Sequence, residues 1–345
     1  MCDTPTQPHC NPNARYRTFD GSCNNLRNPL LGTPVQPQSR FLPPEYVGDI
    51  DLPRTKSLQN ERLPRVRPTS NTMNSKNQGT CLDDVTVAVL SWGTLVVRDT
   101  LETPSTSIKL SVKRAYNVLA ECFHINVNDD DPYFNVTCLD FVRASPILAD
   151  QCRPGRRQQI NQLNSYLDAS QVYGLSEADN DKIRVYRGGL LKVNNDNIPD
   201  KQDSQSIDEI ITQTAFFRLH NIYAKQLSHF NPFWNDEKIF QETRKIIGAV
   251  VQKITYDEYL TTFLNDETRE KYCLKSSCRQ YDETEDPQLR VGYSVAAGRF
   301  GHSRIPPLQR FVNNILRVLP GPTSPSLLKQ LVDDILQEKA GCVDR

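Results

Sequence analysis

The stretch Asn164-Ser165-Tyr166-Leu167-Asp168-Ala169-Ser170-Gln171-Val172-Tyr173-Gly174 lies near the middle of the 345-residue chain. Asn164, Tyr166, Asp168 and Ser170 alternate in it, so an extended loop could aim several oxygen atoms at one point. Calcium is bound in this way by loops whose alternate residues supply oxygen ligands. The alternative is an ordinary polar turn. The pattern therefore predicts either a cation-binding loop or a polar turn.

Helical periodicity surrounds this stretch on both sides. Upstream, apolar residues at intervals of three or four predict an amphipathic helix that runs into Arg98-Asp99: Val85, Val89, Trp92 and Val96. Downstream, the clearest helix spans 207–230, with a predicted apolar face of Ile207, Ile211, Ala215, Leu219, Ile222 and Leu227. Another helix follows the capping sequence Asn235-Asp236-Glu237, with the apolar row Ile239, Ile246, Val250 and Ile254. Strand-like alternation is scarce, so we expect a mainly α fold with long loops.

Three regions differ in composition. Residues 1–80 are rich in Pro, Asn, Arg and Ser, which predicts an extended segment wrapping the core, with 63–78 as an exposed loop. Residues 81–306 carry the helical periodicity and form the predicted core. Residues 307–345 form a divergent C-terminal segment, in which 313–339 could be one or two amphipathic helices broken at Pro320-Gly321-Pro322.

Charge and cysteine content narrow the class of protein. Lys plus Arg and Asp plus Glu both number 41, and this balance gives no reason to expect a nucleic-acid or membrane-surface partner. No apolar run approaches the roughly 18–20 residues that span a bilayer. Ten cysteines without an obvious metal-binding pattern favour an oxidising compartment, where Asn135-Val136-Thr137 would be a glycosylation acceptor. Met1-Cys2-Asp3-Thr4-Pro5 has no signal-peptide features, so either a signal peptide has been removed or the chain was never exported. The cysteine content favours removal, and we expect an extracellular protein.

Six segments between residue 10 and about residue 306 resemble, in order, the animal haem peroxidases, the family of myeloperoxidase, peroxidasin, chorion peroxidase and peroxinectin. The segments are Tyr16-Arg17-Thr18-Phe19-Asp20-Gly21-Ser22-Cys23-Asn24-Asn25-Leu26, Arg40-Phe41-Leu42-Pro43-Pro44-Glu45-Tyr46, Gln159-Ile160-Asn161-Gln162 through Asp168-Ala169-Ser170-Gln171-Val172-Tyr173-Gly174, Phe217-Arg218-Leu219-His220-Asn221, Gln252-Lys253-Ile254-Thr255-Tyr256-Asp257-Glu258-Tyr259-Leu260 and Arg299-Phe300-Gly301-His302-Ser303. One such match would be weak, whereas six in the family's order are highly specific. The resemblance implies a disulfide-containing, mainly α domain, haem b and Ca²⁺ as cofactors, and hydrogen-peroxide-dependent oxidation of a donor in the response to oxidative stress.

The resemblance also implies roles for particular residues. It assigns calcium ligands to Asp99, the backbone carbonyl of Tyr166, Asp168 and Ser170, with Asn164 in place of the family's usual Thr. It makes His302 the proximal haem iron ligand, and the small residues of Ala296-Ala297-Gly298 would permit close approach to a flat macrocycle. His220 also falls in a family segment, on a packed helix, where a structural role is expected.

The distal side of the implied haem pocket departs from the family. The family's distal helix reads Trp-Gly-Gln-x-x-Asp-His-Asp, whereas this chain has Trp92-Gly93-Thr94-Leu95-Val96-Val97-Arg98-Asp99. Arg98 therefore stands at the distal His position, and Val97 stands where an Asp can esterify the haem. Counting back without a gap from Phe217 puts Gln202 at the distal Arg position and Gln205 at the second ester-forming carboxylate. No catalytic residue of the family is intact by this alignment.

The proximal side departs as well. The family motif Asn-x-x-Arg-x-Arg-Asp-His-Gly, whose Asn hydrogen-bonds the proximal imidazole, has no counterpart between Ser303 and Arg345, so the domain looks C-terminally shortened. Because such partners orient a metal-bound His, their loss weakens the case for haem binding.

Three functions remain open. One is a secreted pseudo-peroxidase that acts through contacts with an extracellular protein or matrix partner. Another is a haem enzyme with altered distal chemistry, and the third is a shortened product without a stable function. The family pattern of cysteines suggests a Cys10–Cys23 bridge and another among Cys122, Cys138 and Cys152, and Cys273–Cys278 is a plausible local bridge.

Overall fold

The computed structural model describes residues 7–73, 85–105, 122–147, 155–195, 199, 207–278 and 281–304, with 329, 332–333 and 336–337 near the C-terminus. Gln202 and Gln205, Cys152, and most of the predicted C-terminal helices lie outside these residues.

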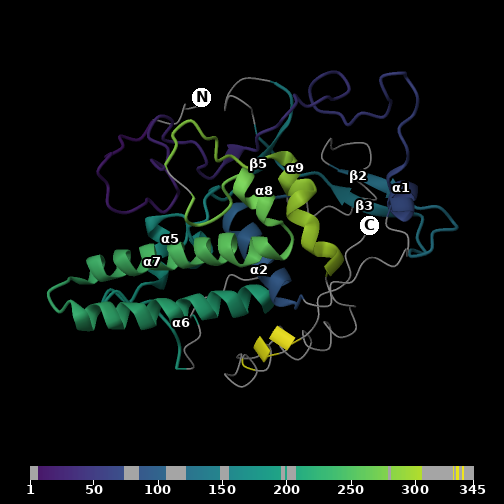
Figure 1. The fold of residues 1–345 in the computed structure, drawn as a ribbon. Helices are drawn as coiled ribbons and strands as arrows, with labels where there is room; N and C mark the ends of the chain where they lie inside the picture. Colours follow the sequence, from purple (N-terminus) through teal and green to yellow (C-terminus); the bar gives the residue numbers. More distant parts are fainter. Residues whose placement is uncertain are drawn as a thin grey trace.

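The chain forms mainly helices joined by long loops, as expected (Figure 1). The helices are α1 (Val66–Met73), α2 (Ala88–Thr100), α4 (Ser170–Tyr173), α5 (Glu177–Ile183), α6 (Ile207–Phe230), α7 (Asp236–Asp257), α8 (Asp266–Lys271) and α9 (Val291–Val295), with the 3-10 helices η1 (Tyr259–Thr262) and η2 (Ala297–Arg304). The strands are β1 (Gln36–Pro37), β2 (Cys122–Asn126), β3 (Cys138–Val142), β4 (Pro146–Ile147) and β5 (Gln158–Asn161). Within the described part of the chain, no helix is both long enough and apolar enough to cross a membrane.

The strands form two small antiparallel sheets. One has the order β1-β5-β4, with Gln36 paired to Asn161 and Pro146 paired to Gln159. The other is the β2–β3 hairpin, in which Cys122 pairs with Val142 and Asn126 with Cys138. Cys138 is a free cysteine, so the bridge expected among Cys122, Cys138 and Cys152 does not involve it.

The core lies where α6 and α7, side by side in Figure 1, meet α2 and α4. Its buried members come from these helices, from the N-terminal segment and from the turn after α5: Phe19, Leu95, Ala169, Val172, Tyr173, Leu191, Phe216, Phe217, Phe240, Ile247 and Val251. Because Ala169, Val172 and Tyr173 belong to the stretch 164–174, the candidate loop is built into the core.

The predicted bounds of α6 are confirmed, but its predicted apolar face is only partly buried, with Leu219 packed against the core. Ala215 and Ile222 are exposed, whereas Phe217, His220 and Ala224 are buried. The large Phe217 ring removes more apolar area from water than the Ala215 methyl, so packing rotates the helix toward the aromatic side. His220 is fully buried, as its expected place on a packed helix implies.

The expected structural role of His220 is confirmed by its two partners. Its Nε2–H donates to the Gly189 carbonyl at 2.8 Å, and the Tyr173 hydroxyl donates to its Nδ1 at 2.8 Å. A carbonyl can only accept a hydrogen bond, which fixes the neutral ring in this tautomer. The imidazole therefore joins α6 to α4 and to the turn after α5.

Helix α7 begins where the capping sequence predicts. The Asn235 side chain accepts the backbone N–H of Lys238 at 2.9 Å, as an N-cap residue does. The buried face starts at Ile239, as predicted. Further along the helix the buried residues lie one position C-terminal to the predicted ones, and the face includes Phe240, Thr243, Ile247, Val251 and Thr255.

The N-terminal segment runs over the core without long regular structure, apart from one helix. Phe19 enters the core, and the backbone of Gln38 donates to Gln159 at 2.8 Å. The expected exposed loop over 63–78 is partly wrong, because residues 66–73 form α1. Arg67 on α1 forms an ion pair with Asp131 in the β2–β3 turn, with Nε 2.7 Å from Oδ2, and this long-range contact stabilises a helix that has no apolar periodicity.

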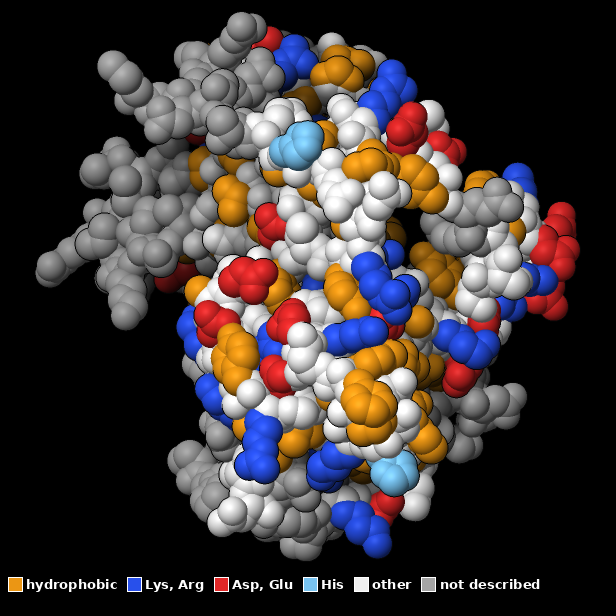
Figure 2. Space-filling model, turned by 90° about the vertical axis from the view of Figure 1, so that its left-hand side faces the viewer, with side chains coloured by type: hydrophobic (Ala, Val, Ile, Leu, Met, Phe, Trp, Pro, Cys, Tyr) orange, Lys and Arg blue, Asp and Glu red, His pale blue; other side chains and the backbone are white. Residues whose placement is uncertain are grey.

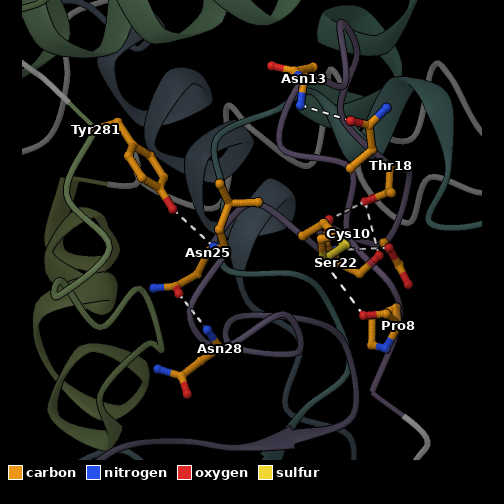
Figure 3. The surroundings of a disulfide bond; sticks show 12 residues. Pro8, Cys10, Asn13, Thr18, Ser22, Asn25, Asn28 and Tyr281 are labelled. Atoms are coloured by element: carbon orange, nitrogen blue, oxygen red, sulfur yellow. Dashed lines mark hydrogen bonds between the residues drawn. A yellow bond between two sulfur atoms is a disulfide. The ribbon is translucent and has the colours of Figure 1, made fainter.

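Two predicted disulfides are confirmed, Cys10–Cys23 and Cys273–Cys278. Figure 3 shows the first, which closes the loop that begins the family-like sequence. Inside this loop the Thr18 hydroxyl donates to the Ser22 carbonyl at 2.7 Å. Just beyond it, the Tyr281 hydroxyl accepts the Leu26 N–H at 3.0 Å, which ties the loop region to a distant segment.

Candidate functional site

Helix α2 carries both the predicted distal position and the first predicted calcium ligand. The Trp92 indole donates to the Thr255 hydroxyl at 3.1 Å. Gly93 leaves room for Tyr259, since a Cβ at Gly93 would lie 2.8 Å from the Tyr259 hydroxyl. These two contacts fix the rotation of α2 about its axis and direct Asp99 toward the loop 164–174.

Asp99 attaches the end of α2 to the candidate loop. Its side chain is fully buried, and Oδ2 accepts the backbone N–H groups of Asp168 and Ala169, both at 3.0 Å. Oδ1 accepts the Gln171 N–H at 3.1 Å and the Ser170 hydroxyl at 3.2 Å. One carboxylate therefore organises four donors of the loop.

The backbone conformation of Ala169 makes this arrangement possible. Its φ of 63° lies in the left-handed region, which non-glycine residues seldom adopt. This conformation turns successive N–H groups toward Asp99. Its free-energy cost is offset because the surrounding core fixes the loop. The backbone N–H groups that bind Asp99 could not be predicted from the sequence, because every residue except proline has one.

Asp99 and Asp168 place two carboxylates in the same buried region. Burial, and secondarily the charge of Asp168, raise the pKa of Asp99 to about 7. Burial also raises the pKa of Asp168, while the positive charges of Arg244 and Arg17 oppose this shift. Two neighbouring carboxylates out of water favour a nearby positive charge, and a divalent cation would supply one.

The remaining predicted calcium ligands lie in the same loop. Asn164 is fully buried, its amide nitrogen donates to Asp168 Oδ2 at 3.0 Å, and its amide oxygen accepts the Tyr166 N–H at 3.0 Å. Rotation of this amide by 180° would turn its oxygen toward Asp168. The Ser170 N–H also donates to Asp168, at 3.0 Å.

The structure thus brings Asp99, Asn164, Tyr166, Asp168 and Ser170 into one hydrogen-bonded unit. In the part of the chain that is described, no three His, Cys, Asp or Glu side chains form a metal cluster. The oxygen atoms brought together here belong to two carboxylates, an amide and a hydroxyl. This hard, oxygen-only set fits Ca²⁺.

Arg98 and Val97 precede Asp99 on α2, and both side chains are partly buried. Successive helical residues point about 100° apart, so Arg98 and Asp99 face different directions. Asp99 points toward the loop, and Arg98 directly precedes it on the same helix.

His302 lies on η2 and is exposed. This helix packs on the N-terminal half of α2, because a Cβ at Gly301 would lie 3.0 Å from Leu90 Cδ1. The Phe300 ring lies 5.3 Å from that of Phe263 and fixes the same element.

Haem fits this arrangement in part. The exposed imidazole of His302 offers a nitrogen that can ligate iron. Among the residues the structure describes, none hydrogen-bonds this imidazole, although ligating histidines are ordinarily oriented by such a partner. The residues therefore provide an axial ligand without its orienting contact.

The structure is a mainly helical, disulfide-containing scaffold in which an oxygen-rich loop is attached to a central helix. These features are those expected of an animal haem peroxidase domain, and comparison with known proteins tests this expectation. The sequence model of the animal haem peroxidase family matches residues 16–332. The chain belongs to the animal haem peroxidase family.

Individual relatives agree with this assignment. Myeloperoxidase from Mus musculus is 31% identical over 92% of this chain and 50% of its own length. Chorion peroxidase from Drosophila melanogaster is 29% identical over 88% of this chain and 44% of its own length. The chain therefore spans about half the length of these relatives.

Solved structures show the same fold. Peroxidase A from Dictyostelium discoideum aligns with a TM-score of 0.64 at 22% identity, covering 85% of this chain and 60% of that one. A fatty acid alpha-dioxygenase from Oryza sativa aligns with a TM-score of 0.55 at 17% identity, covering 72% of this chain and 39% of that one.

Proposed function

We propose that this chain is a pseudo-peroxidase, a member of the animal haem peroxidase family in which peroxide turnover is impaired. The observation that carries the proposal is Arg98, which stands on α2 directly before Asp99, at the family's distal His position. Because Asp99 makes four loop contacts, the register of the helix around Arg98 is well supported.

The impairment follows from proton chemistry. Cleavage of a peroxide needs a base that takes a proton from one oxygen and returns it to the other. A guanidinium stays protonated at every physiological pH and has no lone pair to accept that proton. General base catalysis is worth about 10²–10⁴-fold in rate, so its loss reduces turnover by that order.

The second candidate is a haem-binding peroxidase with altered distal chemistry, and His302 favours it. His302 would hold the iron, and haem would supply the redox centre for peroxide. Arg98 would then contribute only positive charge, which stabilises developing negative charge without moving a proton.

Calcium would hold the loop 164–174 to α2 in either case. Asp99, Asp168, Ser170, the Tyr166 carbonyl and Asn164 would be its ligands. Neutralisation of the two buried carboxylates supports this role, because it removes their mutual repulsion.

We also propose an extracellular location with a protein or matrix partner. Two disulfides among the described cysteines support an oxidising compartment. Asn135 of the sequence Asn135-Val136-Thr137 lies exposed in the turn between β2 and β3, where a glycan could be attached. The family's extracellular peroxidases favour this location over the cytosol.

An absorption spectrum of the chain expressed with haem, recorded before and after peroxide, tests the proposal. We expect peroxide-dependent oxidation of a phenol at the level of free haem, whether or not a Soret band appears. A Soret band lost in His302→Ala would favour haem binding through His302. Robust phenol oxidation that His302→Ala abolishes would overturn the pseudo-peroxidase and establish the second candidate.

A further inference from the structure

A cavity of about 270 Å³ lies between the N-terminal loop and one face of α7. The loop side supplies Arg15, Tyr16 and Arg17, which lie inside the segment closed by the Cys10–Cys23 disulfide. The helix side supplies residues spaced as one face of a helix: Gln241, Arg244, Lys245, Gly248, Ala249 and Gln252. Asp168 completes the lining. Figure 1 shows the purple N-terminal loop on the same side as the N-terminal half of α7.

Four of the lining side chains are cationic, and only Asp168 is acidic. Arg15 is neutralised by Glu242, whose Oε1 accepts the Arg15 Nε–H at 2.6 Å. In the described part of the chain, Arg17, Arg244 and Lys245 form no ion pair. The cavity therefore carries excess positive charge.

Arg244 is held rigidly at this cavity. It is only 7% exposed, and its terminal nitrogens donate to the carbonyls of Arg17 at 2.8 Å and Thr18 at 2.9 Å. Its guanidinium carbon lies 4.1 Å from the centre of the Phe19 ring. The negative charge of Asp168 acts on Arg244 from nearby, and an anionic ligand in the cavity would add a direct partner for this mostly buried guanidinium.

Asp168 balances part of this charge, because Arg244 and Arg17 act on its carboxylate through their positive charges. Its carboxylate already accepts hydrogen bonds from Asn164 and from the Ser170 N–H, and it faces Asp99 in the buried loop. With Arg15 paired to Glu242 and only Asp168 opposing Arg17, Arg244 and Lys245, the lining keeps a net positive charge that is available to an anion from solvent.

The size and walls of the cavity set the class of ligand. Its volume lies just below the roughly 300–1,000 Å³ of common small-molecule pockets, so the ligand must be small. The helix wall is shaped by Gly248 and Ala249, and a Cβ at Gly248 would meet only the Asp168 carbonyl at 3.7 Å. This leaves space for a short apolar body beside the cationic groups. Figure 2 views the side on which the α6–α7 turn lies and shows Lys and Arg side chains beside hydrophobic ones.

We propose that this cavity binds a small organic anion, either a carboxylate or a phosphate monoester. Arg17, Arg244 and Lys245 contact its acidic group. Arginine and lysine side chains form strong charge-assisted hydrogen bonds with both kinds of oxyanion. The site is independent of haem and of peroxide turnover.

Isothermal titration of the full chain with phenyl phosphate and with benzoate, at constant ionic strength and low chloride, tests the proposal. Uncharged benzamide is the control ligand. We expect saturable one-to-one binding of at least one acid and none of benzamide. The acid that binds more tightly distinguishes the phosphate from the carboxylate class.

Two variants test the location. The double variant Arg17→Gln, Lys245→Gln should weaken binding at least tenfold, and both residues are exposed, so the fold should persist. Gly248→Leu should block the cavity without changing charge. Lys253→Gln, on the same helix but outside the cavity and paired with Asp257, should bind as wild type does. No saturable binding of either acid, or equal binding by wild type and both cavity variants, would overturn the proposal.

Discussion

Asp99 accepts the backbone N–H of Asp168 at 3.0 Å across a separation of 69 residues, and both side chains are buried. Through this contact the end of a helix and an irregular loop become one unit. The same contact brings two carboxylates together away from solvent, and both have a raised pKa.

The proposed calcium site predicts that Ca²⁺ stabilises the wild-type chain, because the ion would bind the folded loop and neutralise the two carboxylates. At a calcium concentration of 100 times Kd, linkage predicts about 2.7 kcal/mol of added stability. Asp168→Asn should abolish the calcium-dependent rise in Tm, measured by thermal unfolding. Asp140→Asn, at an exposed strand position, should leave that rise intact. An equal rise in wild type and Asp168→Asn would contradict calcium binding at this loop.

Stability should fall as the pH is lowered from 6.5 toward 4, because of His220. Burial lowers the pKa of this imidazole to about 4, so the unfolded chain takes up the proton first. Its contribution is complete above the unfolded pKa of about 6.5 and is lost as the pH falls through the folded pKa. The difference of the two pKa values corresponds to on the order of 3 kcal/mol.

Urea unfolding at pH 7 and pH 4.5 measures this effect. Other titrating groups, including Asp99, contribute similarly to wild type and to His220→Gln, so the difference between the two isolates His220. We expect a smaller loss of stability on acidification in His220→Gln. Identical pH dependence in the two proteins would show that this imidazole does not govern acid stability.

Gly189→Ala should destabilise the fold by about 3 kcal/mol or more, through strain and overpacking. Gly189 has a φ of +67°, and an added Cβ would lie 2.7 Å from both Ile239 Cγ2 and the backbone nitrogen of Phe240. Gly188 is the matched control, since its φ is +64° but nothing lies within 4 Å of an added Cβ. Gly188→Ala should therefore cost only the backbone term of roughly 1–2 kcal/mol. The free energy of unfolding of the two variants, measured by chemical denaturation, checks this difference. Equal losses of stability in both variants would refute the prediction.

Removal of the Cys10–Cys23 bridge by substitution of both cysteines with Ser should cost about 3 kcal/mol, because it frees a loop of 13-residue separation in the unfolded chain. The corresponding change at Cys273 and Cys278, with a separation of 5, should cost about 2 kcal/mol. Urea midpoints compare the two. A larger loss at the shorter loop would contradict the entropic account.

The helices were predictable because their signals are local. The bounds of α6 and the Asn235 cap of α7 follow from periodicity and from a side chain that accepts a nearby N–H. The face that α6 buries was not predictable from periodicity, since the packing of Phe217 and His220 against α4 and α7 decides it.

The candidate site divides in the same way. The calcium ligands could be proposed because loop and helix each carry a recognisable pattern, and the structure brings them together. The cationic cavity could not be predicted from the sequence, because Arg244 donates to the Arg17 carbonyl across 227 residues. Neither residue alone has a context that distinguishes it from a surface arginine.

Substitutions at the neighbouring positions 98 and 99 on α2 have different structural consequences. Asp99 holds the loop through four hydrogen bonds, while Arg98 points about 100° away and has no part in those contacts. Selection can therefore change the chemistry of this helix one residue from an anchor without dismantling the architecture. The architecture around Asp99 therefore sets no requirement on the chemistry of position 98.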